Sequence, residues 1–112
     1  MTPAELYPIL SRYAQSQGFQ INKDKEMVLE ILAGLLENER RYGYRSCPCR
    51  LASGLREEDR DISCPCVYSR LDIAEYGSCF CGLYVSGAWN EGQIEKVPIP
   101  ERRPTQRKSA SQ

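Results

Sequence analysis

The reactive side chains of this sequence are concentrated in three Cys-x-Cys pairs. The pairs are Cys47-Pro48-Cys49, Cys64-Pro65-Cys66 and Cys79-Phe80-Cys81, and they contain all six cysteines of the 112-residue chain. The sequence has no histidine, so a transition metal would be held mainly by thiolates. Soft thiolate ligands favour Fe–S clusters, zinc or Cu(I).

The spacing within each pair suits a shared centre better than a disulfide of its own. Residues i and i+2 of an extended segment point to the same side, so each pair presents two sulfurs toward one centre. A disulfide within a pair is disfavoured, because its small ring would strain the preferred dihedral angle and Cα separation. Four thiolates hold a [4Fe–4S] cluster, so six sulfurs leave two over. Those two are available for a disulfide between different pairs, and a reduced thiolate there would attack a partner's disulfide.

Two helices are predicted ahead of the cysteine pairs. Thr2-Pro3-Ala4-Glu5 has the pattern of a capping box, and Pro8 is expected to delay or bend the helix that follows. That helix is expected to stop at Gly18, and Asn22 is expected to cap a second helix that ends at Gly43. A broad apolar stripe predicts the core-facing side of the second helix, with a partner-helix surface as the alternative. The stripe consists of Met27, Val28, Ile31, Leu32, Leu35 and Leu36.

The remaining segments are predicted to be short. The charged run 56–61 is expected to be a solvated loop or a short helical face. Residues 72–76 are expected to form one helical turn, and 82–86 a short strand that leaves the last cysteine pair. The end of the chain is polar and basic, so we expect one domain over residues 1–100 and a frayed polar tail over 101–112.

Composition argues against several functional classes. The chain has 15 basic and 15 acidic residues, so no broad basic character favours nucleic-acid binding. Its beginning does not have the pattern of a signal peptide, and no membrane span is predicted. We therefore expect a cytoplasmic protein, where paired cysteines usually serve metal or redox chemistry. A secreted domain with three disulfides is the alternative.

The three motifs and the helix before them resemble the catalytic (beta) subunit of ferredoxin:thioredoxin reductase. The resemblance rests on Cys47-Pro48-Cys49-Arg50, Cys64-Pro65-Cys66-Val67 and Cys79-Phe80-Cys81, and it covers roughly residues 22–86. It implies an oxidoreductase with a small, mostly helical α+β domain built around a [4Fe–4S] cluster. It also implies a ferredoxin-like electron donor and a thioredoxin-like disulfide substrate, with a small variable subunit as an optional partner.

The roles of the individual cysteines follow from the resemblance alone. It implies that Cys49 and Cys81 form the redox-active disulfide. The cysteine matching Cys49 attacks thioredoxin, whereas the one matching Cys81 contacts the cluster and releases the product. The expected iron ligands are Cys47, Cys64, Cys66 and Cys79.

The sequence departs from the plant-type pattern at two places. Phe80 stands where chloroplast and cyanobacterial members have a histidine thought to assist proton handling, and we expect Phe80 to serve packing. Tyr68, Tyr84 or water are candidates for the proton step. Fourteen residues separate the first two pairs and twelve the last two, and the second spacer is longer than in plant-type enzymes. This favours a bacterial or archaeal branch.

Three other functions stay open from the sequence. Structural zinc is disfavoured because zinc sites usually use Cys-x₂₋₄-Cys pairs, whereas each pair here has one intervening residue. A one-electron [4Fe–4S] carrier would leave Cys49 and Cys81 as inert thiols. A redox sensor would report the state of its cluster or disulfide without turnover.

A few other side chains have weaker claims to function. Arg50 either lowers the pKa of Cys49 or orients a partner protein, or is a surface arginine. Trp89 and Tyr84 are expected to pack rather than to line a docking surface. Four basic residues are expected to belong to a solvated tail rather than to attract an acidic ferredoxin. They are Arg102, Arg103, Arg107 and Lys108.

Overall fold

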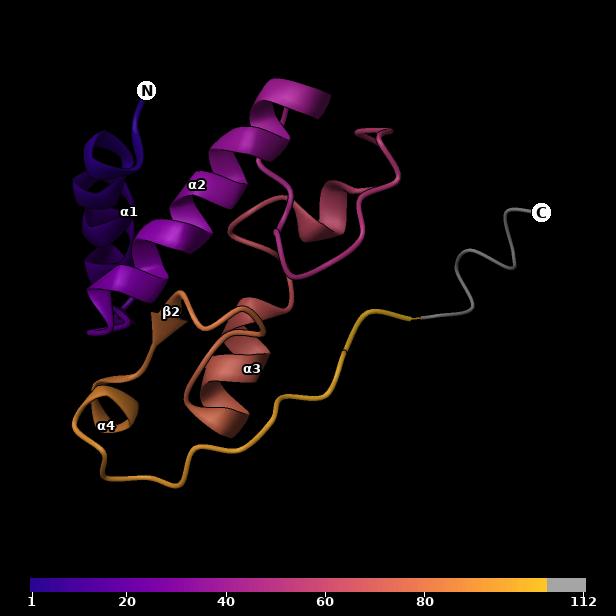
Figure 1. Ribbon diagram of the computed structural model, residues 1–112. Helices are drawn as coiled ribbons and strands as arrows, with labels where there is room; N and C mark the ends of the chain where they lie inside the picture. The colour runs from indigo at the N-terminus through magenta and orange to yellow at the C-terminus, as the bar shows by residue number, and fades with distance from the viewer. Residues whose placement is uncertain (105–112) are drawn as a thin grey trace.

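The computed structural model of the protein describes residues 1–104 and has a mostly helical architecture with one small sheet (Figure 1). The predicted mostly helical α+β class is therefore confirmed. In chain order, the elements of the described part are α1 (Pro3–Ser16), β1 (Gln20–Ile21), α2 (Lys25–Tyr42), the 3₁₀ helix η1 (Arg60–Ile62), α3 (Ser69–Tyr76), β2 (Tyr84–Val85) and α4 (Gly87–Asn90).

Helix α1 begins with the predicted capping box. The amide of Glu5 donates to Thr2 Oγ1 over 3.2 Å, and the amide of Thr2 donates to Glu5 Oε1 over 2.8 Å. Pro8 lies inside the helix, which nevertheless begins at Pro3, so the predicted late start is wrong. Pro8 lies beyond the first four amides, which have no intrahelical acceptor, so its missing amide removes the hydrogen bond that would otherwise reach the carbonyl of Ala4.

Helix α2 is capped by Asp24 rather than by Asn22, which corrects the predicted start. Asp24 accepts a hydrogen bond from the amide of Met27, whereas Asn22 lies two residues too early. Asn22 instead donates from its side chain to the carbonyl of Gly82 over 2.9 Å. The helix ends as predicted at Gly43, whose φ of +87° is the left-handed conformation that glycine adopts without strain.

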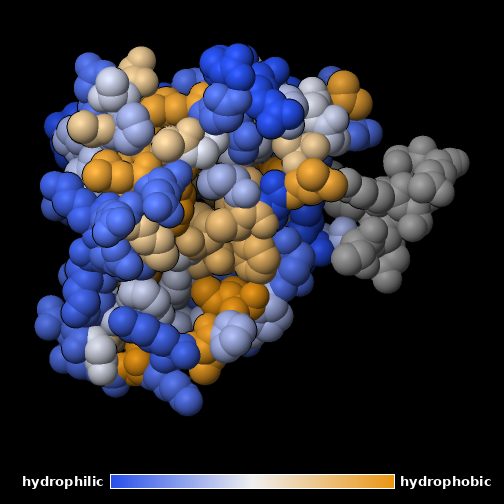
Figure 2. All heavy atoms as spheres, viewed as in Figure 1, coloured by the Kyte–Doolittle hydropathy of each residue, from blue (hydrophilic) through white to orange (hydrophobic). Residues whose placement is uncertain are grey.

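The core lies where α1 and α2 pack against each other. Leu6, Leu10 and Ala14 of α1 are buried there. The predicted stripe of α2 is confirmed as core, because Val28, Ile31, Leu32 and Leu35 are buried and the flanking Met27 and Leu36 are partly buried. Figure 2 shows apolar residues in the middle of the viewed face, with hydrophilic residues around them.

A two-stranded antiparallel sheet connects the helices to the last cysteine pair. Gln20 pairs with Val85 and Ile21 with Tyr84. The predicted strand over 82–86 is therefore confirmed, although it is shorter than expected. The ring of Tyr84 also meets the edge of the Tyr13 ring on α1, with the centroids 5.5 Å apart.

The charged run before the second pair is mostly exposed, as predicted, except at Asp59. Asp59 is fully buried and accepts hydrogen bonds from the hydroxyl of Tyr44 and the amides of Ser53 and Gly54. The run also contains the start of η1. A buried carboxylate needs such donors, because desolvation without them would be costly.

Residues 93–104, here called the C-terminal strap, run back past α3 without forming a helix or strand (Figure 1). The expected frayed tail from residue 101 is wrong for its first three residues. Glu101 forms an ion pair with Arg50, Arg102 pairs with Asp72 and Glu75, and Arg103 pairs with Asp61. Residues 105–112 of that predicted tail, including Arg107 and Lys108, lie outside the described residues.

No helix among residues 1–104 combines the length and the apolar character needed to cross a bilayer.

Candidate metal and redox site

Backbone hydrogen bonds bring the first two cysteine pairs together. The amide of Cys47 donates to the carbonyl of Ile62 over 2.8 Å, and the amide of Cys64 donates to the carbonyl of Arg45 over 2.7 Å. Ser46 and Ser63 form an antiparallel bridge between these two bonds. The two segments therefore enter the site as a short ladder, which fixes the register of one pair against the other.

The third pair is held against the sheet. The amide of Cys79 donates to the carbonyl of Tyr84 over 2.9 Å, and the amide of Gly82 closes a turn to the carbonyl of Cys79 over 3.0 Å. The amide of Tyr84 also points at Cys79 Sγ over 3.3 Å. Because Tyr84 belongs to β2, the pairing of β2 with β1 fixes the place of this cysteine pair.

Helix α2 supports the first pair through a glycine that the sequence prediction did not single out. A Cβ atom at Gly34 would lie 2.8 Å from Cβ of Pro48, closer than carbon atoms of this kind approach. The absence of a side chain at Gly34 thus lets the helix approach the Cys-Pro-Cys backbone. A glycine in a helix interior, which costs helix stability, is the sequence signal for such a contact.

The sulfurs converge on one small pocket between the three pairs. It is lined by five cysteines together with Arg50, Ser69, Phe80 and Tyr84. The four cysteines predicted as iron ligands, Cys47, Cys64, Cys66 and Cys79, all line it, and the fifth is Cys81. Their assignment as ligands stays a prediction.

A second grouping of sulfurs overlaps the first. The Sγ atoms of Cys47, Cys49 and Cys81 all lie within 4.8 Å of one another. Cys49 and Cys81 carry free thiols in this structure. Cys49 belongs to the exposed residues of the chain, whereas Cys47 is buried. Cys47 and Cys81 therefore join the pocket to the exposed thiol.

The thiols of Cys49 and Cys81 differ in pKa. Hydrogen bonds from the Cys47 and Cys81 thiols hold the pKa of Cys49 well below its usual value, and the charge of Arg50 acts in the same direction. The same hydrogen bonds raise the pKa of Cys81 well above its usual value. Without a disulfide, Cys49 is thus the member of this group that loses its proton most readily, and a thiolate is the nucleophile in disulfide exchange.

Arg50 is buried in the site, so the surface-arginine alternative is wrong. Its side chain is only 2% exposed. It donates to Glu101 from Nε and Nη2 and to Cys66 Sγ from Nη1 over 3.5 Å. Its partner Glu101 lies in a polar stretch with no pattern that predicted a contact with the cysteines.

The buried hydroxyl of Tyr84 indicates which kind of group the pocket suits. Its side chain is 1% exposed, which confirms packing, and its hydroxyl makes no hydrogen bond of good geometry within residues 1–104. Burial and the neighbouring Cys64 thiol raise the pKa of the phenol, so the group stays protonated as a donor. A buried donor among thiols needs an acceptor, and Fe–S groups accept such hydrogen bonds on sulfur. The residues present therefore fit a thiolate-held iron–sulfur group.

Other sequence-predicted residues contribute in different ways. Phe80 packs beneath the Arg50 guanidinium, as expected for a packing residue. The hydroxyl of Tyr68 donates to Asp61 over 2.6 Å, and the Lys96 ammonium lies 4.1 Å from the centroid of the Trp89 ring.

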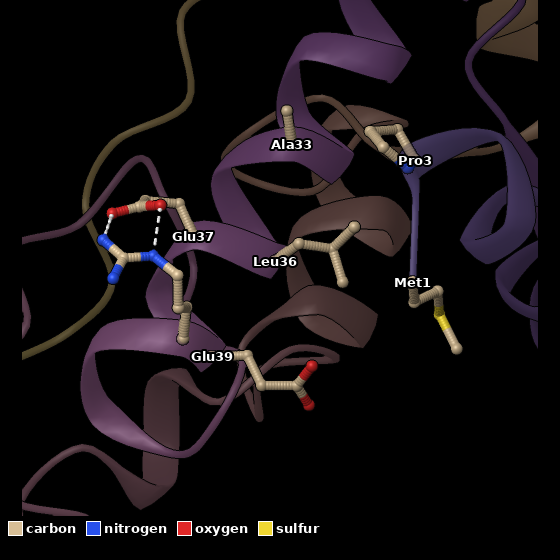
Figure 3. Close-up of a pocket in the computed structure, with 7 residues that line it drawn as sticks. Met1, Pro3, Ala33, Leu36, Glu37 and Glu39 are labelled. Atoms are coloured by element: carbon tan, nitrogen blue, oxygen red, sulfur yellow. Dashed lines mark hydrogen bonds and ion pairs between the residues drawn. The ribbon is translucent and has the colours of Figure 1, made fainter.

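A more open hollow lies between the chain start and α2. It is lined by Met1, Pro3 and Leu36 among others, and its lining includes no cysteine and no site residue (Figure 3).

The fold and the grouped sulfurs define a small, mostly helical domain with a cysteine centre suited to metal and redox chemistry. The family model described as ferredoxin thioredoxin reductase catalytic beta chain matches residues 5–102, which is most of the chain. The chain therefore belongs to this family, which is a family of oxidoreductases. A comparison with curated proteins found no match.

Proposed function

We propose that this chain is an iron–sulfur disulfide reductase. In this proposal Cys49 and Cys81 form the redox-active disulfide beside a [4Fe–4S] cluster. Its ligands are Cys47, Cys64, Cys66 and Cys79. The observation that carries the proposal is the place of Cys81, which lines the pocket with the four ligand cysteines and also lies within 4.8 Å of the exposed Cys49.

The family description names the partners that the proposal assigns to this chain. A ferredoxin-like protein donates the electrons, and thioredoxin or a thioredoxin-like protein is the disulfide substrate. The cluster supplies electrons one at a time when it is bound. A cytoplasmic location, an optional small variable subunit and the bacterial or archaeal branch stay predictions from the sequence.

The chemistry of the chain's own residues balances as follows. The disulfide between Cys49 and Cys81 takes up two electrons and two protons, and its S–S bond breaks to give two thiols. The Cys49 thiolate attacks one sulfur of the partner's disulfide, and the partner's other sulfur leaves as a thiolate that takes a proton. The Cys81 thiolate then attacks Cys49 Sγ. This restores the internal disulfide and releases the partner's second thiol.

The arrangement suits this division of roles. Cys49 combines exposure with a lowered pKa, so it can reach a partner as a thiolate. Cys81 lies behind it, with its sulfur 3.8 Å from that of the predicted ligand Cys79. This supports roles in which Cys81 faces the predicted ligands and Cys49 faces the solvent.

Two serine variants test the proposal on anaerobically prepared protein. Cys49→Ser is expected to keep iron, sulfide and brown colour while thioredoxin reduction falls to background. Cys64→Ser is expected to lose the iron and bleach the protein. Zinc in place of iron would overturn the metal assignment. A Cys49→Ser protein that still reduces thioredoxin would identify another nucleophile, and an unchanged protein that holds iron without reducing thioredoxin would identify an electron carrier.

Thiol counting separates a reductase from a carrier or a sensor. We expect two thiols to disappear when the cluster-loaded protein is oxidised, and to return with reductant. Peptide mapping should place both on Cys49 and Cys81. An unchanged thiol count would show that these cysteines do not form a disulfide and would favour the one-electron carrier.

A further inference from the structure

One side chain contacts all three Cys-x-Cys pairs. Arg50 directly follows Cys49 of the first pair. Its Nη1 lies 3.5 Å from the sulfur of Cys66 in the second pair. Its guanidinium carbon lies 4.4 Å from the ring centroid of Phe80 in the third pair.

Glu101 fixes the orientation of this guanidinium. Its carboxylate accepts from Arg50 Nε over 2.8 Å and from Nη2 over 2.9 Å. A bidentate pair of this kind sets the plane of the fork as well as its place. With Nε and Nη2 occupied, the remaining nitrogen, Nη1, points at Cys66 Sγ.

Two aromatic rings lie close to the guanidinium. The Phe80 centroid lies at 4.4 Å and the Tyr68 centroid at 5.2 Å, both within cation–π range. Phe80 stands between the two cysteines of the third pair, so the ring links Arg50 to that pair. A flat apolar ring at this position gives a guanidinium a surface on which to stack.

The charge of Arg50 is therefore both fixed and desolvated. The side chain is 2% exposed, compared with 30% for Arg102 and 72% for Arg40, which also form ion pairs. A buried positive charge acts more strongly on its neighbours than a screened surface charge does. Its nearest sulfur belongs to a predicted metal ligand.

We propose that Arg50 is a positioning residue that holds the three cysteine pairs together and raises the reduction potential of the metal centre, with Glu101 as its orienting partner and Phe80 as its platform. The inference rests on the proposed metal centre. A hydrogen bond and a positive charge at a ligand sulfur stabilise the more negative, reduced state of an Fe–S group. Cys66 is the sulfur at which Arg50 acts.

The test is a redox titration of the metal-loaded protein, followed by electron paramagnetic resonance. Arg50→Gln removes the charge at similar size, and we expect it to make reduction harder by about tenfold in the equilibrium constant, or about 59 mV for one electron. Arg50→Lys keeps the charge without the fork and should lie between this variant and the unchanged protein. Arg102→Gln is the control, because it removes a strap ion pair whose acceptors are Asp72 and Glu75 rather than a cysteine.

A potential that is the same in Arg50→Gln as in the unchanged protein, at equal iron content, would overturn the inference. If Arg50→Gln fails to retain iron, Arg50→Lys and Phe80→Leu decide the matter, because the first removes the fork that aims Nη1 at Cys66 Sγ and the second removes the ring on which the guanidinium stacks. A negative shift in either supports the role of Arg50, and no shift in both overturns it. A centre without any redox transition would overturn the proposed function as well, whereas a redox-active centre insensitive to Arg50 overturns only this inference.

Discussion

Helices α1 and α2 are held together by aliphatic side chains, whereas the cysteine region, residues 44–82, combines buried apolar side chains such as Ile62 with buried polar groups and ion pairs. In the helix pair, Leu6, Leu32 and Leu35 are fully buried. In the cysteine region, the fully buried side chains include the carboxylates Asp59 and Asp72, and Arg50 is nearly buried. The helix pair can thus gain stability from area alone, whereas the cysteine region depends on specific partners.

This difference explains why the C-terminal strap matters to the site. Its ion pairs reach Arg50, Asp61 and Asp72, which all belong to the cysteine region. Buried charges of this kind need partners more than they add net stability. The strap therefore completes the polar interior of a region that has little regular secondary structure of its own.

The largest effect on the free energy of unfolding is expected in the helix pair. Leu32→Ala removes a fully buried side chain and should cost about 2–5 kcal/mol, measured by urea unfolding. Ile9→Ala on α1 is the control, since Ile9 is 41% exposed and its truncation should cost well under 2 kcal/mol. Equal losses at both positions would show that the core does not lie between these helices.

A smaller effect is expected at the buried carboxylate of the cysteine region. Asp59→Asn keeps the size of the side chain but turns an NH₂ group toward donors, so it should cost about 1–3 kcal/mol at neutral pH. Glu57→Gln, an exposed change in the same charged run, should stay within about 0.5 kcal/mol. A Glu57 variant as damaging as the Asp59 variant would show that the overall charge of the run, rather than burial, is responsible.

The pH dependence of the same variant identifies the cause. Burial raises the pKa of Asp59, but hydrogen bonds from Tyr44, Ser53 and Gly54 outweigh it and leave the pKa below its usual value. A carboxylate with a lowered pKa stabilises the fold above its unfolded pKa of about 3.9, and this stability is lost as the pH falls through the folded value. The stability gap between the unchanged protein and Asp59→Asn should therefore narrow in acid, in urea unfolding below about pH 4.

The helix pair was largely predictable from the sequence because its stability is local and periodic. The capping box, the apolar stripe of α2 and the stop at Gly43 are each visible within a few residues. The cap of α2 was misassigned because Asn22 and Asp24 are both good caps. In the structure the side-chain oxygen of Asn22 accepts from the amide of Asp24, and Asp24 accepts from the amide of Met27 in the first turn.

The cysteine region was predictable in its chemistry but not in its supports. The three pairs indicate a shared centre by residue type and spacing alone. Asp59 and Glu101 look like ordinary charged surface residues, because their burial or pairing is created by distant partners such as Tyr44 and Arg50. No short-range pattern encodes such contacts.

The smallest stability change is expected at Gly34, where the two regions meet. Gly34→Ala should stabilise the interior of α2 by about 1 kcal/mol, because alanine has the higher helix propensity. Ala33→Gly is the control, since the neighbouring Ala33 is exposed and its replacement should cost the same propensity free energy. The new Cβ would lie 2.8 Å from Cβ of Pro48, so the first cysteine pair must move and the gain should disappear. Urea unfolding gives the net change, and the alkylation rate of Cys49 in the metal-loaded, reduced protein reports the displaced pair. A Gly34→Ala protein that gains the full helix term with an unchanged alkylation rate would show that α2 does not position the cysteines.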